Sequence, residues 1–162
     1  MTVGDAAAVL QRVLEYVAQR MRYEIDRPAA DYWQTPVESF RRGAGDCEDF
    51  AIAKYVSLRS LGVSLDKLRL VYVRAQINGT SQAHMVLAYY PSPRAEPLIL
   101  DNLIGEIRPA AQRNDLFPVF SFNSQGLWVG SGASEKASGS ATARLSRWRE
   151  LLVRMRDEGI EL

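Results

Sequence analysis

The segment from Asp46 to Leu61 constrains the fold more than any other part of this chain of 162 residues. It is predicted to be a helix, because Gly43 and Gly45 punctuate its approach and Gly62 supplies a C-terminal stop. The middle of this helix is apolar on most sides, so it has no broad face suited to water. Such a helix must lie at the centre of a domain, and the rest of the chain must cover it.

The elements around this helix indicate the fold class. Apolar residues at helical spacing predict a first helix over residues 5–22. Segments rich in branched and aromatic residues follow the central helix and predict strands. These strands are expected over residues 68–75, 82–90, 98–101, 118–122 and 127–129. Asn78-Gly79 is a strong signal for a tight turn after the first of them. Helices first and strands afterwards indicate an α+β domain.

The overall composition excludes several classes of function. The chain has 20 basic and 19 acidic residues and a net charge of +1, so no electrostatic footprint indicates nucleic acid or an anionic membrane as a partner. No stretch reaches the roughly 20 apolar residues that a membrane helix needs, so direct membrane insertion is not expected. Residues 1–5 lack the basic and apolar regions of a signal peptide. Because such a segment can be removed, this says little about location.

The C-terminal part of the chain differs in composition from the rest. Residues 131–143 are dominated by Gly, Ser and Ala without periodicity, which predicts a flexible linker or loop. Residues 144–162 are predicted to form an amphipathic helix. Its apolar stripe consists of Leu145, Trp148, Leu152 and Met155. We expect this stripe to pack on the main domain, and docking on a partner is the alternative. The predicted organisation is a domain over residues 1–130, a linker over 131–143 and a helix over 144–162.

The chain contains one cysteine, Cys47, and one histidine, His84. A single cysteine excludes an internal disulfide and a multi-cysteine zinc site. Cys47 falls in the first turn of the central helix, where free backbone N–H groups and the helix dipole favour a thiolate. The same N–H groups can stabilise the oxyanion that forms when a thiolate attacks a carbonyl. The alternative role for an isolated cysteine is that of a small buried hydrophobic side chain.

A cysteine nucleophile needs a base and a group that orients the base. His84 lies near the start of one predicted strand, and Asp101 ends another. If these strands are neighbours, Asp101 can accept a hydrogen bond from one ring nitrogen of His84 while the other nitrogen faces Cys47. Spacing alone leaves two other roles open, namely a core histidine and a strand-end aspartate that satisfies a turn.

Acidic residues surround the cysteine. Asp46, Glu48 and Asp49 crowd one helical turn, and their charges oppose formation of a thiolate. One explanation is structural, because Asp46 can cap the helix and acids in a first turn interact favourably with its dipole. The other is a bound calcium ion, held by these carboxylates together with backbone carbonyls and water. The array is not an EF-hand loop, so the residues alone leave both explanations open.

Several stretches of the chain resemble the bacterial transglutaminase-like cysteine proteases of the LapG type. They are DYWQTPVES at 31–39, GAGDCEDFAIAKY at 43–55, QAHMVLAYY at 82–90, LDNL at 100–103, PVFSFN at 118–123 and GLW at 126–128. The resemblance covers about residues 5–130, and the run around Cys47 is highly specific. It implies a papain/transglutaminase-like core, in which the catalytic cysteine begins a central helix packed on an antiparallel β-sheet.

The resemblance also implies site residues, partners and a location. It places Cys47, His84 and Asp101 on the catalytic triad of the family. It places Asp46 and Glu48, together with Asp49, on the calcium site of the family. It implies a periplasmic protease that cuts a large surface adhesin near its N-terminus, at a di-alanine site, which releases the adhesin and disperses biofilm. An inner-membrane receptor that senses cyclic di-GMP is expected to sequester the protease when the dinucleotide is abundant.

Two other functions remain open at this point. Transglutaminase-like folds also transfer acyl groups to amines and hydrolyse amides of small substrates. The alternative from a different class is a calcium-binding interaction module in which the triad is vestigial.

Overall fold

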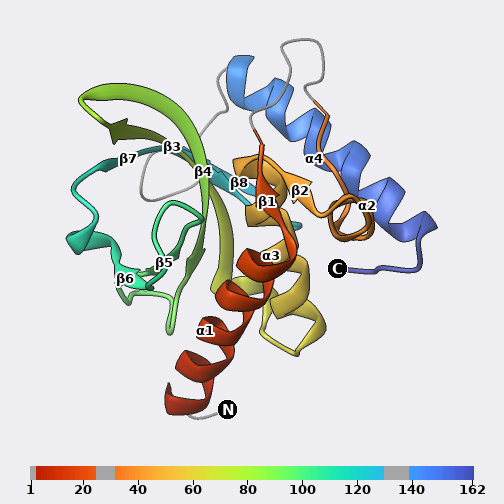
Figure 1. Cartoon of the computed structure of the whole chain (residues 1–162), viewed down its shortest axis with the longest axis horizontal. Coiled ribbons are helices and arrows are strands. Elements are labelled where there is room, and N and C mark those ends of the chain that lie inside the picture. The colour runs from red at the N-terminus through yellow and green to blue at the C-terminus, as the bar shows by residue number, and fades with distance from the viewer. Residues whose placement is uncertain (1–2, 25–31, 130–138) are drawn as a thin grey trace.

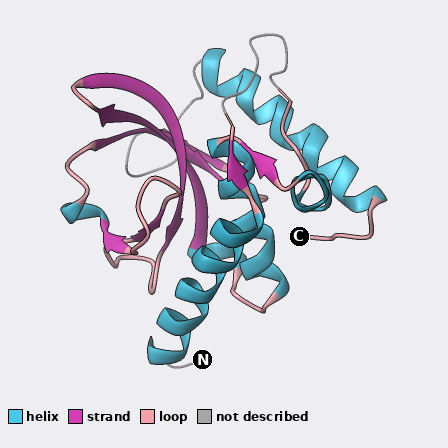
Figure 2. Ribbon diagram, in the orientation of Figure 1, coloured by secondary structure: helices cyan, strands magenta, loops and turns pink. Residues whose placement is uncertain are grey.

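The computed structural model describes residues 3–24, 32–129 and 139–162. Its helices are α1 (Val3–Arg20), α2 (Pro36–Arg42), α3 (Cys47–Ser60) and α4 (Gly139–Asp157), with short 3₁₀ turns η1 (Leu65–Lys67) and η2 (Ala110–Gln112). Its strands are β1 (Arg22–Tyr23), β2 (Ala44–Gly45), β3 (Leu68–Ile77), β4 (Thr80–Tyr89), β5 (Leu98–Leu100), β6 (Arg108–Pro109), β7 (Leu116–Phe122) and β8 (Leu127–Val129). Figure 1 and Figure 2 show the α-helices gathered to one side of the larger sheet.

Helix α3 is the buried centre of the domain, as its sequence predicts. Every side chain from Phe50 to Val56 is buried. The helix begins at Cys47 and is capped by Asp46, which agrees with the predicted start. Helix α1 packs along α3 with an apolar face that consists of Leu10, Val13, Leu14 and Val17. Burial of α3 by α1 on one flank and by the sheet on another therefore fixes where the Cys47 turn lies.

The larger sheet has six strands in the order β6-β5-β4-β3-β7-β8, all antiparallel to their neighbours. Strands β3 and β4 form its long central hairpin, which turns at Asn78-Gly79 as predicted. Both turn residues have positive φ, 51° and 78°, which is the conformation that the Asn-Gly pair favours. Strand β4 is buried from His84 onward, because both faces of the sheet carry an apolar cluster there. This arrangement confirms the predicted α+β class, with a central helix on an antiparallel sheet.

The smaller sheet pairs the end of α1 with the entrance to α3. Strands β1 and β2 run parallel, so that Arg22 lies opposite Ala44 and Tyr23 lies opposite Gly45. Strand β2 is part of the backbone that leads to Cys47, so its pairing with β1 holds this backbone in place.

The start of the C-terminal helix differs from the sequence-based prediction. The structure begins α4 at Gly139, so residues 139–143, predicted as linker, are helical, while residues 131–138 lie outside the described part of the chain. The Gly/Ser/Ala composition suggests flexibility, but alanine is the best helix former, and serine and threonine cost little in a helix that packs on a domain. The helix ends at Asp157, within the predicted range 144–162.

The apolar stripe of α4 packs on the main domain, as predicted. Trp148 and Met155 are buried. The Trp148 ring meets Tyr55 of α3 and Phe122 of β7 edge-on, with centroids 5.5 and 5.3 Å apart. The Trp148 indole N–H also donates to the carbonyl oxygen of Asn123 at 3.3 Å. Helix α4 is therefore part of the same hydrophobic core as α3.

Replacing Trp148 by alanine is expected to lower the free energy of unfolding by about 3–5 kcal/mol, because it leaves a large cavity between α4, α3 and β7. Urea denaturation followed by circular dichroism measures this. Val153 lies on the same helix and is 53% exposed, so Val153→Ala should change stability by no more than about 0.5 kcal/mol. Equal, small losses for both variants would show that α4 is not integral to the core.

Candidate active site

The first turn of α3 is fixed by a capping box. The Asp46 side chain accepts from the Asp49 backbone N–H at 3.2 Å, and Asp49 Oδ2 accepts from the Asp46 backbone N–H at 3.1 Å. Asp49 also accepts from the Gln34 backbone N–H at 2.9 Å and from Gln34 Nε2 at 3.0 Å. Both oxygens of a carboxylate that is only 2% exposed are thus satisfied by protein donors.

Gly45 is required by this packing. A Cβ atom at position 45 would lie 2.6 Å from Asp49 Cβ and 2.9 Å from the Met21 terminal methyl. Asp49 cannot withdraw cheaply, because it is tied into the capping box. The glycine before Asp46-Cys47 therefore lets the Asp49 carboxylate fold back to the Asp46 backbone N–H.

The Cys47 thiol is half-buried and lies beside strand β4. It donates to Glu48 Oε2 at 3.4 Å. Burial raises the pKa of the thiol, the charges of Glu48 and Asp46 raise it further, and a hydrogen bond with the Met85 backbone acts in the opposite direction. This net direction is opposite to the one that the helix N-terminus alone predicts. Because Met85 directly follows His84, the hydrogen bond brings the thiol next to the histidine-bearing part of β4.

Asp101 contacts His84, and their strands are neighbours, as the prediction assumed. Strand β5 pairs with β4, and Asp101 follows the last residue of β5. His84 Nε2 lies 2.6 Å from Asp101 Oδ1, and both side chains are buried. With Nε2 engaged in this way, Nδ1 is the other ring nitrogen, and its pairing with the Cys47 thiol stays a prediction.

Arg113, which the sequence does not single out, holds the other side of the same carboxylate. Arg113 Nη2 donates to Asp101 Oδ2 at 2.8 Å, and the Leu103 backbone N–H donates to Oδ1 at 3.1 Å. Arg113 is anchored in turn by Asp115, to which its Nε and Nη2 donate at 3.0 and 2.9 Å. Burial alone would raise the pKa of the Asp101 carboxyl, but His84 and Arg113 outweigh it and hold that pKa below its usual range.

Lys54 is a second buried cation near the aspartate. It is 1% exposed, and burial lowers its pKa to about 8, while the charge of Asp101 acts in the opposite direction. Lys54, Asp101 and Asn102 line a cavity of about 270 Å³, whose other walls are mainly apolar. Sequence reasoning missed Lys54, although a lysine inside a helix that is otherwise apolar on most sides is a signal that could have identified it. Nothing local pointed to Arg113, which lies in an irregular stretch.

The three predicted calcium ligands have different surroundings. Asp46 and Glu48 flank Cys47, whereas the Asp49 oxygens are already occupied by N–H donors. Among the described residues, no group of three or more His, Cys, Asp or Glu side chains is gathered as a metal site. The assignment of Asp46, Glu48 and Asp49 as calcium ligands thus stays a prediction, with Asp49 in a supporting position.

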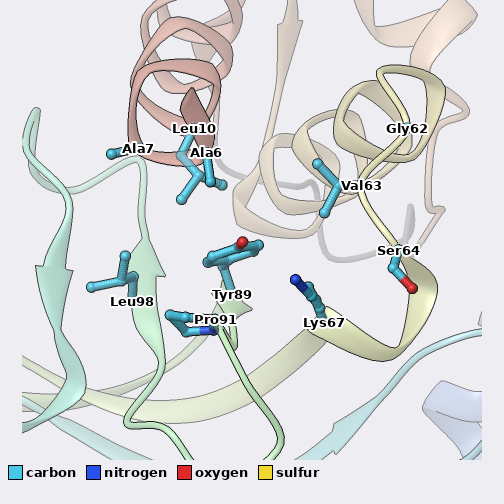
Figure 3. A pocket seen from close by; sticks show the side chains of 10 residues that line it. All are labelled: Ala6, Ala7, Leu10, Gly62, Val63, Ser64, Lys67, Tyr89, Pro91 and Leu98. Carbon is cyan, nitrogen blue, oxygen red and sulfur yellow. The ribbon is translucent and has the colours of Figure 1, made fainter. Parts of the chain in front are cut away.

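A separate cavity of about 220 Å³ lies between α1, the stretch that joins α3 to β3 and the end of β4 (Figure 3). Tyr89 and Leu98 form one wall of it, and Lys67 and Val63 line it from the segment after α3. Gly62 and Val63 follow the C-terminal end of α3, so this cavity lies at the opposite end of α3 from Cys47, and none of the predicted site residues line it.

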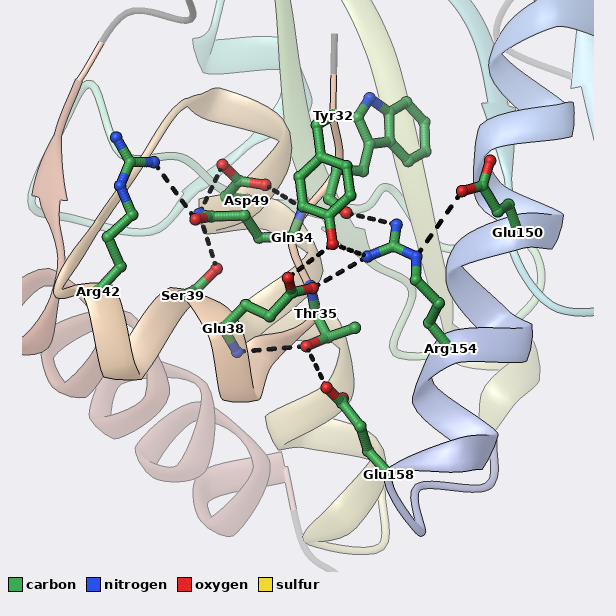
Figure 4. A network of polar contacts seen from close by, with 11 residues as sticks. Tyr32, Gln34, Thr35, Glu38, Ser39, Arg42, Asp49, Glu150, Arg154 and Glu158 are labelled. Carbon is green, nitrogen blue, oxygen red and sulfur yellow. Dashed lines mark hydrogen bonds and ion pairs between the residues drawn. The ribbon is translucent and has the colours of Figure 1, made fainter. Parts of the chain in front are cut away.

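Further polar contacts hold Gln34, whose backbone and side chain donate to Asp49 (Figure 4). Arg42 of α2 donates to Gln34 Oε1 at 3.3 Å, and the Gln34 amide contacts Ser39 at 3.3 Å. The segment that precedes α2 is therefore held on several sides.

Comparisons with known proteins identify the family and agree with the fold. A family model described as bacterial transglutaminase-like cysteine proteinase, BTLCP, matches residues 2–131. An EGTA-treated structure of Legionella pneumophila LapG is 43% identical, with a TM-score of 0.80 over 93% of this chain and 79% of that one. A calcium-bound structure of the same Legionella protein is 43% identical, with a TM-score of 0.75 over 88% and 80%. No curated protein sequence matches the chain. Within the described ranges, no helix is long and apolar enough to cross a membrane.

Replacing Arg113 by methionine is expected to lower the free energy of unfolding near pH 7 by about 3–5 kcal/mol, because the Asp101 carboxylate would stay buried without its cation. In the native protein the pKa of Asp101 is lower than in the unfolded chain. The charged carboxylate therefore stabilises the fold above the unfolded pKa, and this stabilisation is lost as the pH falls through the folded pKa. Losing Arg113 raises the folded pKa, so the deficit of the variant should shrink as the pH falls. Urea denaturation over a pH series measures this.

Arg108→Gln is the control for this variant. Arg108 pairs with Glu106 on the surface, where an ion pair contributes about 0–1 kcal/mol. A pH-independent loss in Arg113→Met would contradict the role given to the Asp101 charge.

Proposed function

Because the chain belongs to the family of bacterial transglutaminase-like cysteine proteinases, we propose that it hydrolyses peptide bonds with Cys47 as nucleophile, His84 as general base and Asp101 as the group that orients the imidazole. The observation that carries this proposal is the buried His84–Asp101 contact of 2.6 Å on β4, the strand whose Met85 backbone hydrogen-bonds with Cys47. Nucleophile, base and orienting group come from α3, β4 and the residue after β5. A cysteine nucleophile requires a base that a third group orients.

The chemistry follows from these positions. Cys47 Sγ attacks the carbonyl carbon of the scissile bond as its proton passes to His84 Nδ1. The oxyanion is stabilised by backbone N–H groups at the start of α3. Collapse of this intermediate breaks the C–N bond, the leaving amine takes the proton from His84, and a thioester remains on Cys47. Water, deprotonated by His84, then attacks the thioester and releases the acid product and the thiol. Asp101 stays ionised throughout, because His84 and Arg113 stabilise its charge.

Calcium is proposed as the cofactor, held by Asp46 and Glu48 with Asp49 supporting the turn. The donor chemistry fits, because these are hard oxygen ligands and the remainder of the shell can be backbone carbonyls and water. The charges of Glu48 and Asp46 are also among the causes of the raised pKa of Cys47. A bound divalent cation supplies positive charge that compensates these carboxylates and so favours the thiolate. The calcium-bound state of Legionella pneumophila LapG supports this part of the proposal.

The biological substrate is proposed from similarity to the LapG type. The protein is a periplasmic endopeptidase that cleaves a large surface adhesin near its N-terminus, at a di-alanine site, and thereby disperses biofilm. An inner-membrane receptor for cyclic di-GMP controls it by sequestration. The 43% identity with Legionella pneumophila LapG over most of both chains supports a shared substrate class.

A purified N-terminal adhesin fragment from the same organism tests the activity. The protein should cleave it with calcium, a calcium-selective chelator should stop the cleavage, and added calcium should restore it. Cys47→Ala should abolish cleavage while circular dichroism stays unchanged, because only the nucleophile is lost. Cleavage by a folded Cys47→Ala variant would refute the mechanism, and transfer of the acyl group to an added amine would identify an acyltransferase.

Alkylation of Cys47 by iodoacetamide tests the effect of calcium on the thiol. Because Cys47 is the single cysteine, mass spectrometry reads its alkylation rate without interference. With chelator the raised pKa should keep the rate at neutral pH below that of a free thiol. Calcium should lower the pKa and move the rise in rate to lower pH. In Glu48→Gln the rate with chelator should increase, because one opposing charge is removed. An identical pH profile with calcium and with chelator would exclude this role of the cation.

A further inference from the structure

Arg154 of α4 contacts the segment before α2 with two nitrogens of its guanidinium (Figure 4). Its Nη2 donates to the Trp33 carbonyl oxygen at 2.7 Å, and its Nη1 donates to Tyr32 Oη at 2.6 Å and to Glu38 Oε1 at 2.9 Å. The guanidinium also lies over the Tyr32 ring, 4.4 Å from its centroid. A planar fork can serve these partners together, whereas a lysine ammonium on a single stem cannot match the geometry.

The Trp33–Gln34 peptide group transmits this contact. Its carbonyl oxygen accepts from Arg154, and its N–H donates to Asp49 Oδ1 at 2.9 Å. A peptide group is rigid and planar, so fixing its oxygen also fixes the direction of its N–H. A cation at the carbonyl also polarises the peptide and strengthens the hydrogen bond that its N–H donates. Arg154 therefore acts on Asp49 through one intervening group.

Asp49 in turn sets the geometry of the Cys47 turn. Its Oδ2 accepts from the Asp46 backbone N–H at 3.1 Å, immediately before Cys47 in the chain. Its side chain also occupies the space beside Gly45 that a Cβ atom would fill. A shift of Asp49 would therefore move the backbone that positions the thiol and the N–H groups at the start of α3.

Helix α4 makes a second contact with the same segment that does not lead to Asp49. Thr35 Oγ1 donates to Glu158 Oε2 at 2.9 Å, and Thr35 caps α2 rather than α3. This contact provides a matched control, because it joins α4 to the neighbouring residue without touching the Trp33–Gln34 peptide group.

We infer that Arg154 is a positioning residue for the reaction: through the Trp33–Gln34 peptide group and the Asp49 carboxylate, α4 holds the turn that presents Cys47. The C-terminal helix, which lies beyond the residues 2–131 that match the family model, is thus a working part of the active site. The inference rests on the proposed function for its meaning in catalysis, but its geometry can be tested on the thiol alone.

The test compares Arg154→Met, Arg154→Lys and Glu158→Gln in the full chain, with calcium present. Arg154→Met should change the rate of Cys47 alkylation, and reduce kcat for peptide cleavage, by about tenfold, since small misplacement of a reacting group has effects of this size. Arg154→Lys should lie close to Arg154→Met, because it keeps the charge but not the fork. Glu158→Gln should stay within about twofold of the native protein in both measurements. Equal effects of Arg154→Met and Glu158→Gln would overturn the inference, because they would reflect loosening of α4 in general.

A double-mutant cycle with Asp49→Asn tests the route. If Arg154 acts through Asp49, Arg154→Met should have little further effect on the alkylation rate in the Asp49→Asn background. Additive effects would overturn the inference. Absence of peptide cleavage by the native protein would refute the proposed function. The alkylation cycle would still decide the inference, because alkylation needs no substrate.

Discussion

The buried carboxylate of Asp49 is the interaction on which the candidate active site depends. It joins the segment before α2, the turn before α3 and α3 itself, through donors on Gln34 and Asp46. Burial still raises its pKa to about 6 despite these hydrogen bonds. A charge this costly to bury is tolerated only where both oxygens have donors, so the surrounding backbone has little freedom to rearrange. The position of Cys47 follows from this arrangement.

The parts of the fold that local physics determines could be predicted from the sequence. Helix α3 was predictable because its apolar residues leave no face for water, and the β3–β4 hairpin because Asn-Gly favours its turn conformation. The meeting of His84 and Asp101 needed one further assumption, that their strands are neighbours, which the pairing of β4 with β5 satisfies. These features depend on contacts near in sequence or on a single choice of strand order.

The features that the sequence did not reveal depend on contacts between residues far apart in the chain, or on opposing effects on a pKa. Arg113 reaches Asp101 from an irregular stretch after β6, and Arg154 reaches Trp33 from the far end of the chain. No periodicity marks such residues, because one side chain carries each contact. The Cys47 thiol shows the second difficulty: the helix N-terminus favours the thiolate, but burial and two adjacent carboxylates together reverse the direction.

The raised pKa of Cys47 has a consequence for its reaction with oxidants. Oxidation to sulfenic acid and beyond proceeds mainly through the thiolate, and its rate follows thiolate content and exposure. A half-buried thiol whose pKa is raised by burial and by Glu48 and Asp46 is a poor target for peroxide. The acidic turn thus protects the thiol from oxidation, and a cation that neutralised these carboxylates would weaken that protection.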